Sequence, residues 1–537
     1  MNARLKPLAL DGLRFDNRFV RELPADPETA NRRRQVKGAC YSRVTPAQAS
    51  RPRLVACSRE TAELLGLSPE VCETDSFSRI FAGNELLAGM EPYAMCYGGH
   101  QFGNWAGQLG DGRAINLGEV IAGDGKHYTL QLKGAGETPY SRTADGLAVL
   151  RSSIREFLCS EAMHHLGVPT TRALCVLETG DSVTRDMFYD GRPKQEPGAV
   201  VCRVSASFIR FGSFEIFASR EDFATLRKLL DFTIRYDFPH LGEPGKDAYI
   251  EWFREVCRRT AEMIVHWQRV GFVHGVMNTD NMSVLGETID YGPYGWLDDF
   301  DPDWTPNTTD AAGRRYRYAH QPQIAMWNLA QLASSVYPLI NDKELLQGAL
   351  EEDYAETFSQ GWQAMMARKL GLANFGGEKD EALIKECCAI LTRVETDMTI
   401  FFRQLAGVDI NIGAADNDDL MEPLLPAYYD PGELSGDYKA RLGNWLRDYI
   451  QRCRRDGDNN NERIRRMNAV NPKYVLRNYM AQLAIDQAEQ GDYTLVNELL
   501  ELLRKPYDEQ PDKAEWYARR PDWARNRPGC SMLSCSS

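Results

Sequence analysis

The sequence predicts an α+β protein in which a strand-rich part with one helix precedes a larger, predominantly helical part. Residues 114–117 and 128–133 alternate between apolar and polar side chains, as strands with one buried face do. Beyond residue 220 the apolar residues recur mainly at helical spacing. The chain of 537 residues is long enough for two or more domains and a large core.

Composition narrows the class of protein. An apolar content of 43% and a charged content of 26% are ordinary for a soluble globular protein, and no apolar run approaches a membrane span. The net charge of −13 argues against non-specific binding to nucleic acid or to anionic membranes. The thirteen cysteines form no pair of CxxC motifs and the N-terminus has no apolar signal core, so we expect reduced thiols in the cytoplasm. Cys535, near the end of the chain, is expected to be exposed and redox-active, with Cys530 as a candidate partner.

The predicted elements follow in order along the chain. We expect helices over residues 147–166, from about residue 252 to Gly271, and over 473–490, and further strands over 200–217. The predicted divisions are an N-terminal extension (1–95), a strand-rich lobe (96–220), a helical lobe (221–407), an acidic linker or loop (408–437) and a C-terminal helical region with the Cys-Ser-Ser tail (438–537).

Glycines are dense between residues 98 and 118, which suits close approach of the backbone to a ligand. Gly110, Gly112 and Arg113 form a GxG turn before a strand, and such a turn can direct backbone N–H groups at a phosphate. Taken alone, the same turn is more often a plain hairpin.

Lys133 ends a predicted strand, and Glu156 lies 23 residues later in the following helix. Kinase folds pair a strand lysine with a helix glutamate to hold a phosphate-binding ammonium group. The alternative is a surface lysine and a solvated glutamate.

The segment from Gly271 to Ser283 and the strand end at Asp290 carry the clearest chemistry. Asn281 follows His274 by seven residues, as in the kinase catalytic loop, but Val276 stands where the kinase base would be. Asp280 is the only carboxylate in the loop and is therefore the candidate proton acceptor, while Asn281 and Asp290 suit a hard cation. His274 is expected to be a packed loop residue.

Two further segments are candidates for the same site. Asp145 and Gly146 lie in a polar loop between strand and helix and could contact a nucleotide. Arg203 and Arg210 lie among apolar residues, where an arginine needs a carboxylate or a phosphate as partner. A structural ion pair is an equally good interpretation of these arginines.

The glycine turn, strand lysine, helix glutamate, His/Asn loop and strand aspartate occur in the order found in protein kinases. Each signal is weak alone, but their order predicts a kinase-like bilobal fold with a strand-rich N-lobe and a helical C-lobe.

Longer motifs resemble the selenoprotein O family over nearly the whole chain. They are Gly107-Gln-Leu-Gly-Asp-Gly-Arg113, Leu132-Lys-Gly-Ala-Gly136, Arg203-Val-Ser-Ala-Ser-Phe-Ile-Arg-Phe-Gly212, His274-Gly-Val-Met-Asn-Thr-Asp-Asn-Met-Ser283, Asp290-Tyr-Gly-Pro293 and the terminal Cys535-Ser-Ser537. The resemblance implies a kinase-fold pseudokinase that transfers AMP from ATP to protein side-chain hydroxyls. For bacterial members it also implies UMP transfer from UTP.

The resemblance also implies roles for individual residues. Asp280 would accept the proton, and Asn281 with Asp290 would hold Mg²⁺ or Mn²⁺. The nucleotide would be inverted relative to a kinase, so that pyrophosphate leaves. The implied nucleotide-binding residues are Gly110, Gly112, Arg113, Lys133, Asp145, Gly146, Glu156, Arg203, Arg210 and Asp290.

One departure and two alternatives remain. Some relatives carry a cysteine in the loop after Asp301, but that loop has none here, so no disulfide through it is expected. A small-molecule phosphotransferase would need a base near Val276, which cannot serve. A non-catalytic ATP-binding scaffold would not need the proton acceptor and metal ligands that the sequence provides.

Overall fold

The computed structural model describes residues 8–142, 146–413, 415–457 and 459–534. It contains an antiparallel sheet and many helices, which confirms the predicted mixture of α and β structure. Within these residues no helix combines the length and the apolar character needed to cross a membrane. The twelve cysteines that fall within them are free thiols, and Cys535 lies outside them.

One sheet organises the strand-rich part. Among the described residues its main path runs in the order β1 (Tyr41–Arg43), β3 (Tyr93–Met95), β6 (Ala114–Ile121), β7 (His127–Lys133), β10 (Lys194–Ser205), β9 (Arg172–Arg185) and β2 (Arg53–Cys57), and β8 (Ala148–Val149) pairs with β10. Residues 1–95, expected to be an extension, thus supply three of these strands. Lys133 is opposite Ala114 on one side and Val201 on the other, so a central strand positions it.

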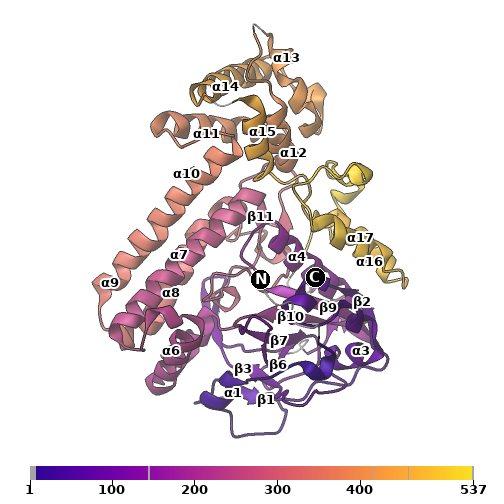
Figure 1. The fold of residues 1–537 in the computed structure, drawn as a ribbon, viewed down its shortest axis with the longest axis vertical. Coiled ribbons are helices and arrows are strands. Elements are labelled where there is room, and N and C mark those ends of the chain that lie inside the picture. Colours follow the sequence, from indigo (N-terminus) through magenta and orange to yellow (C-terminus); the bar gives the residue numbers. More distant parts are fainter. Residues whose placement is uncertain (1–7, 143–145, 414, 458, 535–537) are drawn as a thin grey trace.

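Helices cover both faces of this sheet. On one face, α2 (Arg59–Leu64) and α3 (Asp75–Phe81) contact β9. On the other face, α4 (Leu150–His165) contacts β9 and β10, which confirms the helix predicted over 147–166. The short helix α1 (Arg18–Glu22) lies near β1 (Figure 1).

Two C-terminal helices pack against α4. Both α16 (Asn478–Ala488) and α17 (Thr494–Leu503) contact α4, although they follow it by more than 300 residues (Figure 1). The helix predicted over 473–490 begins at Asn478 instead of Lys473. The backbone N–H groups of Lys473 and Tyr474 both donate to Pro506 O, at 2.7 and 3.0 Å, so contacts with a distant segment hold these residues before the helix begins.

The strand predicted over residues 200–217 is wrong in its second half. β10 ends at Ser205, and residues 211–219 form α5 (Phe211–Ser219). Ser213 Oγ accepts a hydrogen bond from the backbone N–H of Arg210 at 3.2 Å, which satisfies the start of the helix. Residues 211–217 are all buried, Ser213 and Glu215 included, and periodicity does not distinguish a short helix from a strand when every side is buried.

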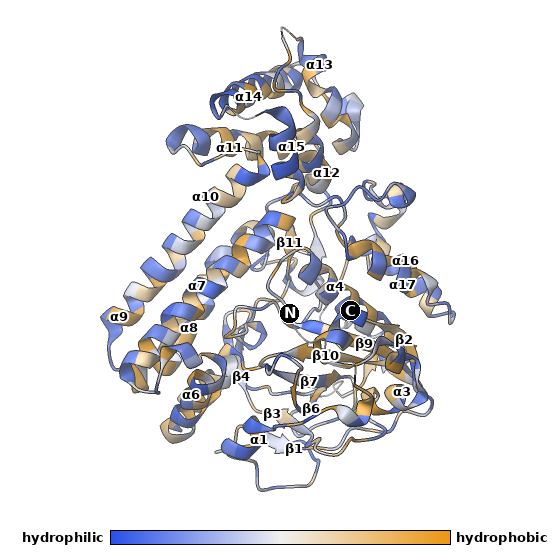
Figure 2. Ribbon diagram, viewed as in Figure 1, coloured by the Kyte–Doolittle hydropathy of each residue, from blue (hydrophilic) through white to orange (hydrophobic). Residues whose placement is uncertain are grey.

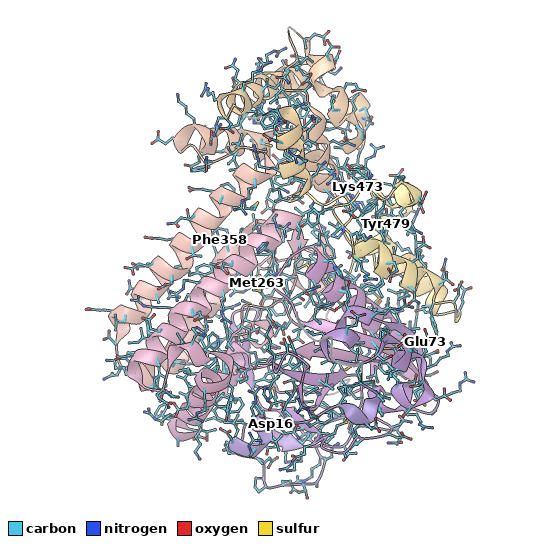
Figure 3. The ribbon with its side chains drawn as sticks, in the orientation of Figure 1. Asp16, Glu73, Met263, Phe358, Lys473 and Tyr479 are labelled. Carbon is cyan, nitrogen blue, oxygen red and sulfur yellow. The ribbon has the colours of Figure 1, made fainter. Side chains whose placement is uncertain are left out.

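The helical part begins with long helices that pack against one another. They are α6 (Phe223–Asp237), α7 (Lys246–Val270), α8 (Gln321–Ile340), α9 (Lys343–Gly348), a π-helical segment (Ala349–Glu356) and α10 (Thr357–Lys369). As predicted, α7 ends at Gly271, whose φ of 74° lies in the left-handed region. Met263 of α7 is buried in the interior, and Phe358 lies on α10 alongside (Figure 3).

The remaining helices form a second core at the far end of the molecule from the sheet (Figure 1). They are α11 (Glu378–Leu391), α12 (Met398–Gln404), α13 (Asn417–Met421), α14 (Gly436–Arg455) and α15 (Asn460–Asn468). Residues 408–437, expected to be a linker or loop, contribute Leu420, Leu424 and Tyr428 to this core. The acidic residues of this segment lie outward while its apolar residues pack, and α14 likewise carries both hydrophilic and hydrophobic residues (Figure 2).

Candidate functional site

A pocket lies between the strand-rich part and the loop that follows α7. Its lining comes from three segments distant in the sequence: the glycine turn, the loop after β7, and the segment between α7 and β12 (Gly295–Trp296). The lining residues are Tyr97, Leu109, Gly110, Gly112, Arg113, Lys133, Tyr140, Arg142, Val276, Asp280, Asn281, Asp290, Gly292 and Pro293.

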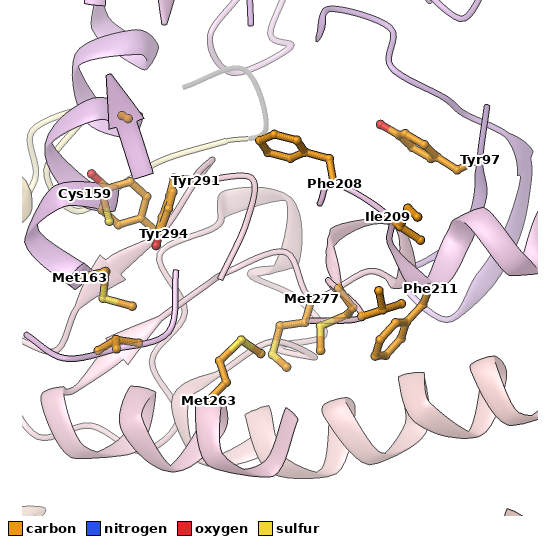
Figure 4. Close-up of a cluster of buried hydrophobic side chains, with 14 of the residues drawn as sticks. Tyr97, Cys159, Met163, Phe208, Ile209, Phe211, Met263, Met277, Tyr291 and Tyr294 are labelled. Atoms are coloured by element: carbon orange, nitrogen blue, oxygen red, sulfur yellow. The ribbon is translucent and has the colours of Figure 1, made fainter. Parts of the chain in front are cut away.

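The loop after α7 is supported from below by packed side chains. β11 (Phe272–Val273) pairs with β12, and Thr279–Asn281 form a single 3₁₀ turn. Met277 and Met263 lie together under the loop, with Phe211 beside them (Figure 4). Because dense packing resists displacement, the loop holds its polar side chains in fixed positions.

His274 is a packed, hydrogen-bonded residue. Its Nε2 lies 2.9 Å from Ile289 O, its Nδ1 lies 3.3 Å from the backbone N–H of Val276, and its ring stacks on Trp267. Since Nδ1 accepts from an N–H group, Nε2 carries the proton and donates to the carbonyl. Burial lowers the pKa of His274, so the ring is neutral and fixes the loop.

Asp280 has the properties of a proton acceptor. Its side chain is buried, Gln101 Nε2 donates to Oδ2 at 3.2 Å, and Oδ1 has no hydrogen-bond partner among the described residues. Burial raises the pKa of Asp280 to about 7. A carboxylate with a pKa near neutral pH can take up and release a proton under ordinary conditions.

Asn281 and Asp290 both line the pocket and carry side-chain oxygen atoms. Asn281 Nδ2 donates to Val276 O at 2.9 Å, which directs the amide oxygen away from the loop. Asp290 has a φ of 58°, a left-handed conformation that is uncommon for a residue other than glycine. Burial opposes ionisation of Asp290, but Arg210, Arg203 and Lys133 outweigh it and hold its pKa well below the usual range.

Five side chains of alternating charge connect the two parts of the site. Lys133 Nζ lies 2.5 Å from Glu156 Oε2, and Arg203 Nη1 lies 2.9 Å from Glu156 Oε1 and 2.6 Å from Asp290 Oδ1. Arg210 Nη1 lies 2.5 Å from Asp290 Oδ2. Three cations and two carboxylates leave one positive charge in excess, which suits a polyphosphate.

The glycine turn needs its glycines. Gly110 has a φ of 75°, and a Cβ there would come within 2.4 Å of the Tyr140 ring. Thr138 Oγ1 donates to Asp111 O at 2.7 Å and Ser141 Oγ donates to Gly112 O, so the loop after β7 holds the turn. The turn therefore packs directly against the loop that carries Arg142.

Most of the predicted site residues come together. Gly110, Gly112, Arg113, Lys133, Asp280, Asn281 and Asp290 line the pocket. Glu156, Arg203 and Arg210 are buried beside it and reach it through Lys133 and Asp290. Both interpretations of the arginines remain open, since each has a carboxylate partner in this ligand-free arrangement.

Two predicted residues are placed differently or not at all. Gly146 is buried and its carbonyl accepts from the Gly136 N–H at 3.1 Å, but it does not line the pocket. Asp145 lies outside the described residues. Arg142, Tyr97 and Tyr140 line the pocket and were not predicted. An arginine within a polar loop between a strand and a helix was the available signal for Arg142.

The donor atoms fit a divalent cation shared with a bound phosphate. No group of three or more His, Cys, Asp or Glu side chains that could hold a metal occurs among the described residues. Mg²⁺, however, is usually bound by one or two protein oxygens together with substrate phosphates and water. An ionised Asp290 and the amide oxygen of Asn281 are hard donors of this kind.

Comparison with known proteins shows the family of this chain. A family model described as "Protein adenylyltransferase SelO" matches residues 28–504. The chain is 60% identical to a protein from Rhodopirellula baltica and 60% identical to one from Aromatoleum aromaticum, both named protein nucleotidyltransferase YdiU. The alignments cover 98% of this chain and 99% and 100% of those proteins. The chain therefore belongs to the SelO family of protein adenylyltransferases.

Proposed function

We propose that this protein is a nucleotidyltransferase that transfers AMP from ATP to hydroxyl groups of proteins, with Asp280 as the proton acceptor. The observation that carries the proposal is Asp280 itself, a buried carboxylate with a pKa of about 7 at the edge of a positively charged pocket. Family membership supports the same reaction. The strand-rich part with Lys133 and Glu156 and the helical part with the loop are the two lobes of a kinase-like fold in this proposal.

The reaction exchanges one bond to phosphorus for another. The acceptor hydroxyl attacks the α-phosphorus, its proton passes to Asp280, and the bond from the α-phosphorus to the bridging oxygen breaks to release pyrophosphate. In-line displacement at phosphorus requires little covalent help, so position and charge decide which phosphorus reacts. Lys133, Arg203 and Arg210 would hold the β- and γ-phosphates.

Asn281 and Asp290 would hold Mg²⁺ or Mn²⁺. Bound there, the cation would neutralise phosphate charge and orient the nucleotide. Arg203 and Arg210 each use one contact to an oxygen of Asp290, and a carboxylate oxygen has a second lone pair. Arg113 and Arg142, which line the pocket, supply further positive charge for the nucleotide.

Labelled ATP tests the proposal directly. The protein is incubated with a mixture of candidate acceptor proteins, Mg²⁺ or Mn²⁺, and ATP labelled at either the α- or the γ-phosphate. We expect label in protein only from the α-phosphate, with release of pyrophosphate. Competition with UTP, followed by intact-mass measurement, decides whether UMP is transferred as well.

The alternatives give different results in the same experiment. Transfer of γ-label would make the protein a phosphotransferase, although Val276 then leaves the usual base position empty. Binding of ATP with no transfer of either label would make it an ATP-binding scaffold. Either result would contradict the proposed reaction.

A further inference from the structure

A second surface, formed around a β-hairpin, lies on the side of Asp280 away from the charged pocket. The hairpin of β4 (Gly98–Gln101) and β5 (Asn104–Gln108) packs against the turn that contains Asp280. A Cβ at Gly99 would come within 2.7 Å of Asp280 Oδ1, and Gln101 donates to Oδ2. The hairpin is therefore in direct contact with the proposed proton acceptor, where an acceptor hydroxyl must arrive.

The hairpin presents aromatic side chains around its tip. The His100 ring lies 5.2 Å from the ring of Trp105 and 5.5 Å from that of Trp327 of α8. Trp105 is 39% exposed, which is unusual for the largest apolar side chain. The His100 ring is held in place, since its Nδ1 lies 2.6 Å from the buried carboxylate of Glu215.

Arg315 completes this surface with a positive charge. Its guanidinium lies 4.7 Å from the centroid of the Trp327 ring, and a Cβ at Gly103 would come within 3.3 Å of its Cζ. In this hairpin Gln101 contacts Asp280 and Gly103 contacts Arg315. The two hairpin residues are two positions apart, so their Cα atoms lie within about 7 Å of each other.

The turn that carries Arg315 is held in place. The buried carboxylate of Asp310 accepts the backbone N–H groups of Arg315 and Tyr316 at 2.9 and 2.7 Å. Asp310 thus binds the backbone of this turn and attracts the Arg315 guanidinium electrostatically, and Tyr316 shares a side-chain hydrogen bond with it, but no carboxylate among the described residues lies within ion-pair distance of Arg315. Its Nε is buried without a hydrogen-bond partner there. Arg315 as a whole is only partly buried, so a carboxylate from another protein can approach the rest of its side chain.

We propose that Arg315 binds a carboxylate of the acceptor protein, so that the preferred acceptor hydroxyl lies within a few residues of an Asp or Glu. This inference rests on the proposed function, because it concerns the acceptor of that reaction. Charge complementarity carries it: a chain with a net charge of −13 repels acidic proteins in general, and Arg315, which contacts the same hairpin as the proton acceptor, attracts an acidic segment locally. Trp105 gives that segment a flat apolar surface.

Matched peptides test the proposal with the full-length protein. Each peptide has one Ser, Thr or Tyr, and a neighbouring position holds Glu, Gln or Lys. We expect kcat/KM for AMP transfer to be about five-fold higher with Glu than with Gln, the size of a partly exposed ion pair. In Arg315→Gln that preference should disappear, while nucleotide affinity and thermal stability stay unchanged.

Two further variants make the assignment specific. Arg465→Gln removes a charge from a 77% exposed arginine of α15, far from the site, and should keep the preference for Glu. Arg315→Glu should favour the Lys peptide over the Glu peptide, which completes a double-mutant cycle. Equal transfer to the Glu and Gln peptides by the unaltered protein would overturn this inference but leave the proposed function standing. Loss of the preference in Arg465→Gln would also overturn it. Absence of transfer to every peptide and protein would overturn the proposed function, and this inference with it.

Discussion

The two sides of Asp280 use arginine in opposite ways. On the nucleotide side, Arg203 and Arg210 are almost fully buried and each contacts a carboxylate. On the hairpin side, Arg315 is only partly buried and stacks on an aromatic ring. A buried, fully connected network is rigid and suits one ligand of constant shape. A stacked arginine and an exposed tryptophan suit partners that share one charge but differ in sequence.

Replacement of Asp280 should have the largest effect, because both sides of the site meet at this carboxylate. Asp280→Asn keeps the size of the side chain but removes the proton acceptor, so we expect kcat to fall by about a thousand-fold. Nucleotide affinity should stay the same. Asp522→Asn, at a 95% exposed position, is the matched control and should keep full activity. Near-normal turnover by Asp280→Asn would assign the proton to another group.

Arg203→Met on the nucleotide side should destabilise the protein more than Arg315→Gln on the hairpin side. It removes one of two cationic partners from the buried Glu156 and from the partly buried Asp290, and we expect a loss of about 3 kcal/mol in the free energy of unfolding together with weaker ATP binding. Arg315→Gln should change the free energy of unfolding by less than about 0.5 kcal/mol. Denaturant titration and binding of a fluorescent ATP analogue measure the two quantities. Equal destabilisation by both substitutions would remove the contrast between the sides.

The pH dependence of kcat/KM should report the pKa of Asp280. Burial raises that pKa to about 7, so the carboxyl is protonated and inactive below pH 7. We expect kcat/KM to rise about ten-fold per pH unit below pH 7 and to level off above it. The hydrogen bond from Gln101 favours the ionised form, so Gln101→Leu should move the inflection to higher pH. An inflection below pH 5 would contradict the assignment.

Trp105→Ala should have the smallest effect, and it should change only the KM for the acceptor. The ring is exposed on the hairpin tip and does not line the nucleotide pocket. We expect KM for acceptor peptides to rise about three-fold, with nucleotide affinity unchanged. Trp523→Ala, at a 45% exposed tryptophan outside this surface, serves as control. A change in ATP affinity in Trp105→Ala would show that the hairpin belongs to the nucleotide side.

The nucleotide side was largely predictable from the sequence, and the hairpin side was not. Lys133 and Glu156 lie at the end of a strand and inside a helix, whose periodicity is visible in the chain, whereas the strand expected to end at Asp290 does not form and Asp290 lies in a loop. Arg315 owes its position to contacts with Gly103 and Trp327, which no local pattern announces. The helix at Phe211–Ser219 was missed for a related reason, because uniform burial removes the alternation that distinguishes strand from helix.

The covering of α4 has a consequence for control of the site. In protein kinases the helix that carries the conserved glutamate moves to switch the enzyme on or off. Here 13 of the 16 residues of α4 are buried, with the sheet on one side and α16 and α17 on the other. Arg155, the neighbour of Glu156, is also tied by its Nη2 to Tyr294 O at 2.8 Å. An outward swing would expose all of this surface, so the packing of α4 opposes a displacement that would separate Glu156 from Lys133.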